Sequence, residues 1–270
     1  MRFGYVRAVR VLSEQQALEI RKRLEDFERK QGGPLQGSLR HKSHLLFPWL
    51  NDLIRGETIL DCVEDLYGPD LLCWTTNFFI KEPHDPAFVS WHQDATYWGL
   101  SSADVVTAWV ALSDSNESNG AMKVIPGSHL REQIPHRDTF APHNLLTRGQ
   151  EVAVEVDDCQ AVSLNLEPGE MSLHHVRIIH GSPANSSPHR RIGFAIRYMP
   201  TYVRQLQGDD SATLVRGVDR FCTFAHEPRP TQDLDPKLVA VHTAVTRRNA
   251  QILYTGTGVQ AFDAPSSERS

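Results

Sequence analysis

The spacing of apolar runs between Leu71 and Tyr198 is the feature that most constrains the fold. Short stretches rich in β-branched and aromatic residues alternate there with Pro, Gly, Asn and Asp. Many short strands with little chain between them are typical of a sandwich or barrel, whereas a parallel sheet would need a helix between successive strands. We therefore expect a mostly β core. The expected strands are 71–80, 88–98, 105–112, 122–126, 152–156, 161–166, 170–175, 178–180 and 190–198.

Two details of this core are expected from local sequence. The run 105–112 is almost entirely apolar, so we expect it, like 88–98, to be a central strand. Asn119-Gly120 is the strongest two-residue hairpin signal in the chain. Residues 130–150 read as a long irregular insertion, and loops of that length are usually lids or binding loops.

Helices are expected on both sides of this core. Ser13 to Gln16 form a capping-box pattern, and apolar residues then recur at helical spacing up to Gln31-Gly32-Gly33-Pro34. A second helical pattern runs from 50 to 67 with an interruption near Gly56, and a third covers 236–251. At 270 residues we expect one domain, with N-terminal helices in 1–70, the β core in 71–200, and C-terminal loops, a helix and a disordered tail (264–270) in 201–270.

Composition argues against several classes of partner. The net charge of −5 and the absence of a long Lys/Arg block argue against a nucleic-acid-binding protein. Apolar runs are too short to cross a bilayer, and the first residues do not resemble a signal peptide, so we expect a cytoplasmic protein without a membrane partner. The four cysteines show no paired spacing and are expected to be reduced.

The chemistry-bearing motif is Trp91-His92-Gln93-Asp94, together with His180 and Arg191 far downstream. Side chains two apart on a strand share a face, so His92 and Asp94 can project into one cavity. A second imidazole from His180 would complete a two-histidine, one-carboxylate face on a metal, which is diagnostic of non-haem Fe(II) oxygenases. The Arg191 guanidinium offers a planar fork for a carboxylate.

Other polar residues are weaker candidates. Arg197 shares strand parity with Arg191, with Gly193 and Ala195 between them, so it either contacts a ligand or pairs with a carboxylate. His41 and His44 lie in a basic segment that could line a substrate pocket or form a surface loop. Most remaining histidines are expected to be surface or hydrogen-bonded structural residues, although His174 shares strand parity with His180 and could approach the site.

The chain resembles the phytanoyl-CoA dioxygenase family of Fe(II)- and 2-oxoglutarate-dependent oxygenases over roughly residues 74–200. Six blocks carry the resemblance in the same order, and they are Trp91-His92-Gln93-Asp94, Thr107-Ala108-Trp109-Val110-Ala111-Leu112, Asn119-Gly120-Ala121-Met122, Ile125-Pro126-Gly127-Ser128-His129, His180-Gly181-Ser182 and Arg190-Arg191.

The resemblance implies a double-stranded β-helix, a cupin-like jelly roll. Its mouth would hold Fe(II) between His92, Asp94 and His180, with O2 and the co-substrate 2-oxoglutarate at the open positions. Arg191 would bind the distal carboxylate of 2-oxoglutarate and Ser182 would help to hold it, while Gln93 and Trp109 match positions near the co-substrate. The implied reaction releases succinate and CO2 and hydroxylates a C–H bond.

Several alternatives stay open at this point. Halogenating relatives carry a small residue at the carboxylate position, so Asp94 argues against halogenation, and desaturation is a further possible outcome. A non-catalytic metal-binding jelly roll or a zinc hydrolase could keep the three ligands, but either would leave Arg191 unexplained. We expect the substrate to be a small polar metabolite, with an anionic one among the options, and we expect Arg197, His41, His44 and the 130–150 segment near it.

Overall fold

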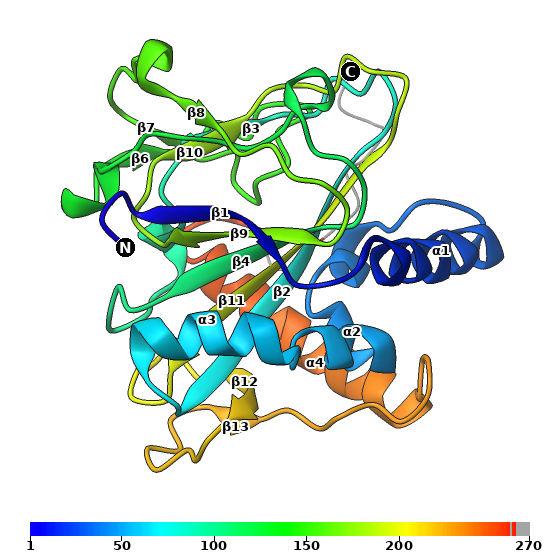
Figure 1. The fold of residues 1–270 in the computed structure, drawn as a ribbon. Coiled ribbons are helices and arrows are strands. Elements are labelled where there is room, and N and C mark those ends of the chain that lie inside the picture. Colours follow the sequence, from blue (N-terminus) through cyan, green and yellow to red (C-terminus); the bar gives the residue numbers. More distant parts are fainter. Residues whose placement is uncertain (260, 263–270) are drawn as a thin grey trace.

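Two antiparallel sheets face each other in the computed structural model of this chain, which describes residues 1–259, 261 and 262 (Figure 1). The mostly β jelly-roll class expected from the sequence is confirmed. The tail expected to be disordered, residues 264–270, lies outside the described residues.

The larger sheet has seven strands among the described residues. In spatial order they are β1 (Tyr5–Arg10), β9 (Glu170–His175), β4 (Val106–Ala111), β11 (Arg191–Pro200), β2 (Leu71–Lys81), β12 (Ser211–Arg216) and β13 (Ala225–His226). All neighbours are antiparallel except β12 and β13. The register between β2 and β11 shifts after Arg197, which pairs with Thr75 while Tyr198 pairs with Cys73. Trp74 is the extra residue of this bulge.

The smaller sheet is built from short strands. Its order is β3 (Val89–His92), β10 (His180–Ser182), β5 (Lys123–Val124) and β8 (Val162–Ser163), and a separate pair joins β6 (His136–Arg137) to β7 (Glu151–Val152). β4 is central, as its apolar sequence predicts. The expectation that the strand carrying His92 is also central is wrong, because β3 pairs with β10 alone and lies at the edge of the smaller sheet.

Strand parity divides the larger sheet into a helix face and a cavity face. Val110 of β4 and Phe194 and Ile196 of β11 share an apolar core with Leu60 and Val63. The alternate positions of β4, β9 and β11 face the smaller sheet instead, and they include Thr107, Trp109, His174, Arg191, Ala195 and Arg197. Because successive strand residues point to opposite faces, the same strands build both the hydrophobic core and the polar cavity.

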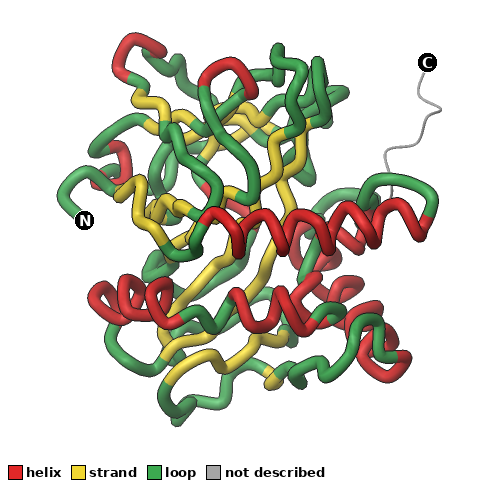
Figure 2. Tube along the Cα trace, turned by 45° about the vertical axis from the view of Figure 1, so that its right-hand side comes forward, coloured by secondary structure: helices red, strands yellow, loops and turns green. Residues whose placement is uncertain are grey.

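Three helices, α1 (Glu14–Gln31), α2 (Pro48–Leu53) and α3 (Glu57–Tyr67), pack against the face away from the smaller sheet. The fourth helix, α4 (Pro236–Leu253), places Asn249 and Leu253 on the cavity side instead. In Figures 1 and 2 the four helices lie in the middle and lower part of the view. The Ser13 capping box and the left-handed Gly32 cap of α1 are present, as is the break near Gly56 between α2 and α3. Short 3-10 helices cover Gly37–Arg40 (η1), Ser43–Leu45 (η2), Asp94–Tyr97 (η3), Glu117–Asn119 (η4), Ser128–Leu130 (η5) and Asp158–Gln160 (η6).

Local structure shows one strand that was not expected and one predicted turn that is wrong. Residues Tyr5–Arg10 form strand β1, which pairs with the edge of β9 and is mostly exposed. An edge strand with one thin buried face carries too few apolar residues to be recognised beside a strong helix signal. Asn119-Gly120 is not a hairpin turn, because Asn119 ends η4 and Gly120 caps it in the left-handed conformation. The Asn116 side chain accepts bonds from the turn and competes successfully with strand pairing.

The insertion at 130–150 is largely irregular, as expected, with β6 as its only strand within the described residues. In the described part of the chain, no helix is long and apolar enough to cross a membrane. All four cysteines are free thiols.

Candidate metal centre and adjoining cavities

His92, Asp94 and His180 meet between the two sheets. His92 ends β3, the chain then leaves the sheet, and Asp94 begins η3. The expectation that both side chains project from one strand is therefore wrong, although the turn brings the Asp94 carboxylate to 3.4 Å from His92 Nε2. His180 begins β10 and is the direct register partner of His92, so their rings lie 4.1 Å apart between centroids.

The geometry of the three residues fits a metal ion. One donor atom from each lies within 4.8 Å of the others, and all three residues are buried. The Nδ1 atoms of His92 and His180 lie 2.9 Å and 3.0 Å from the carbonyl oxygens of Ser90 and Ile178. Such bonds fix the tautomer and leave Nε2 unprotonated and free to coordinate. Two imidazoles and one carboxylate on one side suit Fe(II) with open coordination positions.

The electrostatics favour the forms that bind a cation. Burial alone would raise the pKa of Asp94, but the adjacent His92 and His180 imidazoles and the Arg197 guanidinium lower the pKa below its ordinary value. Burial, reinforced by His92, holds the pKa of His180 well below its ordinary value. Asp94 is thus ionised and His180 neutral near pH 7.

Arg191 enters the same cavity from β11. Its side chain is buried, Nη1 donates to Gly120 O at 2.6 Å, and Nε has no hydrogen-bond partner. No carboxylate of the described residues lies within ion-pair distance of it. Gly120 is held at φ +78, and a Cβ there would lie 2.4 Å from Pro183 O, so only glycine presents this carbonyl.

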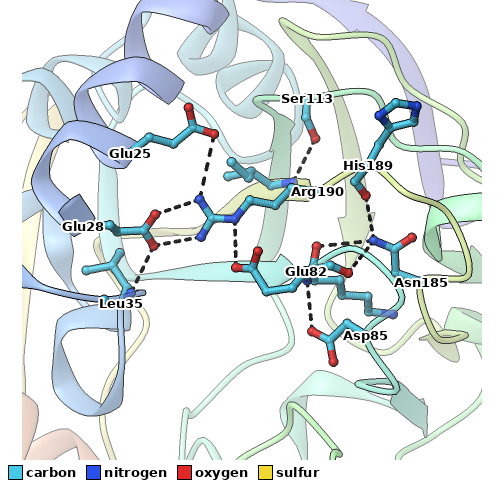
Figure 3. Close-up of polar contacts among 12 residues, drawn as sticks. Glu25, Glu28, Leu35, Glu82, Asp85, Ser113, Asn185, His189 and Arg190 are labelled. Atoms are coloured by element: carbon cyan, nitrogen blue, oxygen red, sulfur yellow. Dashed lines mark hydrogen bonds and ion pairs between the residues drawn. The ribbon is translucent and has the colours of Figure 1, made fainter.

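Arg190, one residue earlier, has opposite surroundings. It points to the helix face, where its guanidinium pairs bidentately with Glu28 of α1 at 2.7 and 2.9 Å and with Glu82 at 2.9 Å (Figure 3). The two carboxylates neutralise the guanidinium charge, and the pair with Glu28 links α1 to the sheet. A buried guanidinium left without an anion, as in Arg191, is costly unless a ligand supplies the anion.

Ser182 and Trp109 line the cavity beside Arg191. The Trp109 ring centroid lies 5.4 Å from the guanidinium carbon. The Ser182 hydroxyl accepts a 2.7 Å bond from Lys81 Nζ, which also donates to Pro183 O. Burial, with neighbouring Arg191, lowers the pKa of Lys81 to about 6. Lys81 was not expected at the site from the sequence, because a lysine at the end of an apolar strand gives no sign that it points inward.

Two candidates do not reach the cavities. The Gln93 side chain donates to Arg177 O and accepts from Ile134 N, so it braces the insertion rather than facing the metal site. His44 is fully buried beside Glu227, Thr76 and Thr213, and the expectation that it contacts the substrate is not carried further.

His174 is the residue the sequence analysis undervalued. It lines the metal cavity, its ring lies 4.8 Å from that of His180, and its Nε2 is 3.9 Å from Asp94 Oδ2. Burial lowers its pKa to about 4, and its Nδ1 has no partner. Pairing of β9 with β4 places it there, which agrees with the strand parity that it shares with His180.

A second cavity adjoins the first. The metal cavity measures about 410 Å³ and its neighbour about 560 Å³, and both open toward solvent. Phe79, Asp94 and Arg197 line both of them. His41 lines the second, where it stacks on Phe262 at 3.7 Å between centroids and contacts Asn77. The 145–150 segment and the end of α4 complete its wall.

Comparisons with known proteins agree with this geometry. The family model for phytanoyl-CoA dioxygenase (PhyH) matches residues 2–193. The probable alpha-ketoglutarate-dependent hypophosphite dioxygenase of Stutzerimonas stutzeri is 31% identical over 176 residues, which are 64% of this chain and 60% of that protein. The chain therefore spans about three fifths of the length of this curated relative.

Solved structures extend the likeness over nearly the whole chain. The apo form of the non-heme monooxygenase ThoJ is 34% identical with a TM-score of 0.83, covering 93% of this chain and 95% of that one. CytC3 with Fe(II) and alpha-ketoglutarate is 25% identical with a TM-score of 0.61, covering 86% of this chain and 94% of that one.

Proposed function

This chain belongs to the phytanoyl-CoA dioxygenase family, and from that premise we propose that it is an Fe(II)- and 2-oxoglutarate-dependent dioxygenase that hydroxylates a C–H bond of a small polar metabolite. One observation carries the proposal. The three buried metal-binding side chains and the buried, anion-free Arg191 share a single cavity. A relative named as a hypophosphite dioxygenase and a neighbour solved with Fe(II) and alpha-ketoglutarate support the same cofactors here.

The proposed reaction consumes O2 and 2-oxoglutarate and converts R–H to R–OH, with release of succinate and CO2. One oxygen atom of O2 enters the product and the other enters succinate. Iron, when bound, supplies the activation of O2, which the protein's own side chains cannot provide. We assign it to His92, Asp94 and His180.

The remaining side chains position the co-substrate. We propose that Arg191 binds the distal carboxylate of 2-oxoglutarate, where its free Nε completes a bidentate fork. Ser182 is held toward the cavity by Lys81 and adds a hydroxyl to that subsite. Trp109 walls the subsite and limits access of water to it. Gln93 acts only indirectly, through the segment that it braces.

The alternatives fit the site less well. A halogenase needs a free coordination position that the Asp94 carboxylate fills. A non-catalytic metal-binding protein or a zinc hydrolase would have no use for a buried guanidinium without an anion in the metal cavity. Desaturation would use the same residues and the same cofactors. We propose hydroxylation because it is the default outcome of this reaction class. We also propose that the enzyme is cytoplasmic and has no nucleic-acid or membrane partner; the net charge of −5 and the lack of a long Lys/Arg block support the absence of a nucleic-acid partner.

Anaerobic addition of Fe(II) and 2-oxoglutarate to the protein tests the assignment. We expect a weak visible charge-transfer band from the chelate. Asp94→Ala should abolish the band, and Arg191→Leu should shift it to 2-oxoglutarate concentrations at least about tenfold higher, because a charge-assisted pair is lost. Asp158→Ala, on the exposed η6, is the matched control and should leave the band unchanged. The proposal fails if the wild-type protein gives no band or if Asp94→Ala retains it.

A further inference from the structure

Arg197 is the second buried arginine of β11 without an anion. Its side chain is 6% exposed, and Nη1 donates to Asn77 Oδ1 at 2.5 Å. Its Nε has no hydrogen-bond partner, and among the described residues no carboxylate lies within ion-pair distance of it. The Phe79 and Trp98 rings lie on it, each 5.7 Å from the guanidinium carbon. A structural arginine at this depth would be expected to have a paired carboxylate, as Arg190 has.

Two further polar groups are left unpaired on the wall of the same second cavity. Thr75 Oγ1 and Asn249 Nδ2 have no hydrogen-bond partner, although the two residues are only 5% and 1% exposed. Thr75 is placed there by the bulge at Trp74, opposite Arg197 in the register. Asn249 arrives from α4, from the other end of the chain. Buried polar groups are almost always hydrogen-bonded, so three orphaned groups around one cavity indicate a missing acceptor.

The charges that line the second cavity indicate the charge of the missing acceptor. Asp94, already assigned to the metal, is the only carboxylate among the described lining residues, and Arg197 is the only permanent cation. Burial holds the pKa of His41 well below its ordinary value, so that ring is neutral. One buried positive charge with neutral donors around it matches one negative charge. A dianionic phosphate would leave an excess charge in a desolvated site.

The rest of the wall is largely aromatic and aliphatic, with His41, Asn77, Thr147 and Gln150 as its polar residues. Trp74, Trp98, Tyr97 and Phe79 form an aromatic side, and Leu145, Leu146 and Leu253 lie among the remaining lining residues. Arg197 lines the metal cavity as well, so a group bound to it lies next to the metal ligands. A carbon skeleton anchored there would lie against the aromatic wall, close to Asp94, which lines both cavities.

We propose that this second cavity binds the primary substrate through a single carboxylate held by Arg197, Thr75 and Asn249, with the apolar part of the substrate against the aromatic wall. This inference rests on the proposed function for the identity of the bound molecule as substrate. It narrows the substrate class from a polar metabolite to a compact monocarboxylic acid with an apolar body.

Matched acid and amide pairs test the carboxylate directly. Binding of 3-phenylpropionate, 4-methylpentanoate and phenylphosphonate would be measured by calorimetry on anaerobic protein loaded with Fe(II) and 2-oxoglutarate, beside 3-phenylpropionamide and 4-methylpentanamide. We expect at least one carboxylate to bind tenfold or more tightly than its amide. Arg197→Leu should remove that preference, and the exposed Arg247→Leu on the same helix as Asn249 should keep it.

Each outcome decides the proposal. Equal affinity for acid and amide, no measurable binding in either pair, tighter binding of the phosphonate, or an unchanged preference in Arg197→Leu would overturn it. The chelate band serves as the folding check for Arg197→Leu. If that variant does not fold, Thr75→Val combined with Asn249→Leu should weaken carboxylate binding severalfold, and unchanged binding in it counts against the site. A wild-type protein without the band refutes the proposed function, while the acid preference can still be measured on metal-free protein.

Discussion

Single residues of β11 have sharply different surroundings. Arg190 forms ion pairs with Glu28 and Glu82 on the helix face. Arg191 and Arg197 lie on the cavity face without an anionic partner among the described residues. Gly193 and Ala195 lie between Arg191 and Arg197 on this strand, and their small size leaves space for the metal cavity. Gly193 is needed there because a Cβ would lie 1.8 Å from Cζ2 of Trp109. The glycine therefore sets the position of the indole beside Arg191.

Gly193→Ala should displace the Trp109 indole and raise the KM for 2-oxoglutarate by about tenfold or more, because misplacement of a positioning group by about 1 Å can cost up to about a hundredfold. Fe(II) binding by the three ligands should be little changed, since none of them contacts Gly193. Steady-state succinate release and metal titration would separate the two effects. Gly33→Ala, which has open space around it, is the control. An unaltered KM would show that the indole does not position the co-substrate.

At the scale of elements, the insertion at 130–150 is fastened to the end of α4 by one side chain. Arg148 is buried, and it donates to Leu253 O and Thr255 O, both at 2.7 Å, and pairs with Asp138 at 3.1 Å. Its guanidinium also lies 3.9 Å above the Tyr97 ring. Since the 145–150 segment and α4 both wall the second cavity, Arg148 holds that cavity closed on one side.

Arg148→Met should loosen this closure while preserving most of the apolar stem. Loss of two charge-assisted bonds to carbonyls, each worth roughly 1.5–3 kcal/mol, is expected to speed amide hydrogen exchange in 138–150 and 250–255. The KM for the primary substrate should rise with that for 2-oxoglutarate unchanged. Arg137→Met, whose partner Glu151 is on the surface, is the comparison. If amide hydrogen exchange in these segments of Arg148→Met is as slow as in the wild-type protein, the role assigned to this side chain is wrong.

At the scale of the whole molecule, a buried ion pair connects segments that are far apart in the sequence. Lys42 Nζ lies 2.6 Å from Glu227, and His44 lies 3.2 Å from the same carboxylate. Ser211 and Thr213 complete its hydrogen bonds, so residues near positions 43, 76, 212 and 227 meet in one network. This fully satisfied cluster has no orphaned group, which is why we assign it to stability rather than to ligand binding.

This network predicts the acid dependence of stability. Burial would raise the pKa of Glu227, but Lys42 and His44 lower it below the ordinary value of 4.5. A carboxyl whose pKa is lower in the folded state contributes its full stabilisation above about pH 5 and loses it as the pH falls toward the folded pKa. Glu227→Gln should cost about 3 kcal/mol at pH 7, since Lys42 is left uncompensated, and should flatten the decline below pH 5. Urea unfolding across pH 3–7 measures both, with the exposed Glu155→Gln as control; parallel profiles for Glu227→Gln and wild type would refute the role.

The sequence by itself determined the parts of the protein that depend on local periodicity and on residue type. The helix of 14–31 with its Ser13 cap, the buried run of β4 and the shared face of Arg191 and Arg197 all follow from spacing along one segment. The chemical identities of His92, Asp94 and His180 likewise indicated a metal site before any fold was known. These features are local or chemical, and neither kind requires knowledge of strand pairing.

Tertiary structure decided the rest, because it depends on contacts between distant segments. The pairing of β9 with β4 brought His174 beside Asp94, and the packing of α1 gave Arg190 the Glu28 carboxylate, whereas Arg191 has no anionic partner among the described residues. Only the folded chain shows that Thr75 and Asn249 are unpaired around Arg197. An unsatisfied buried group is defined by the absence of partners in three dimensions, and no sequence pattern records that absence.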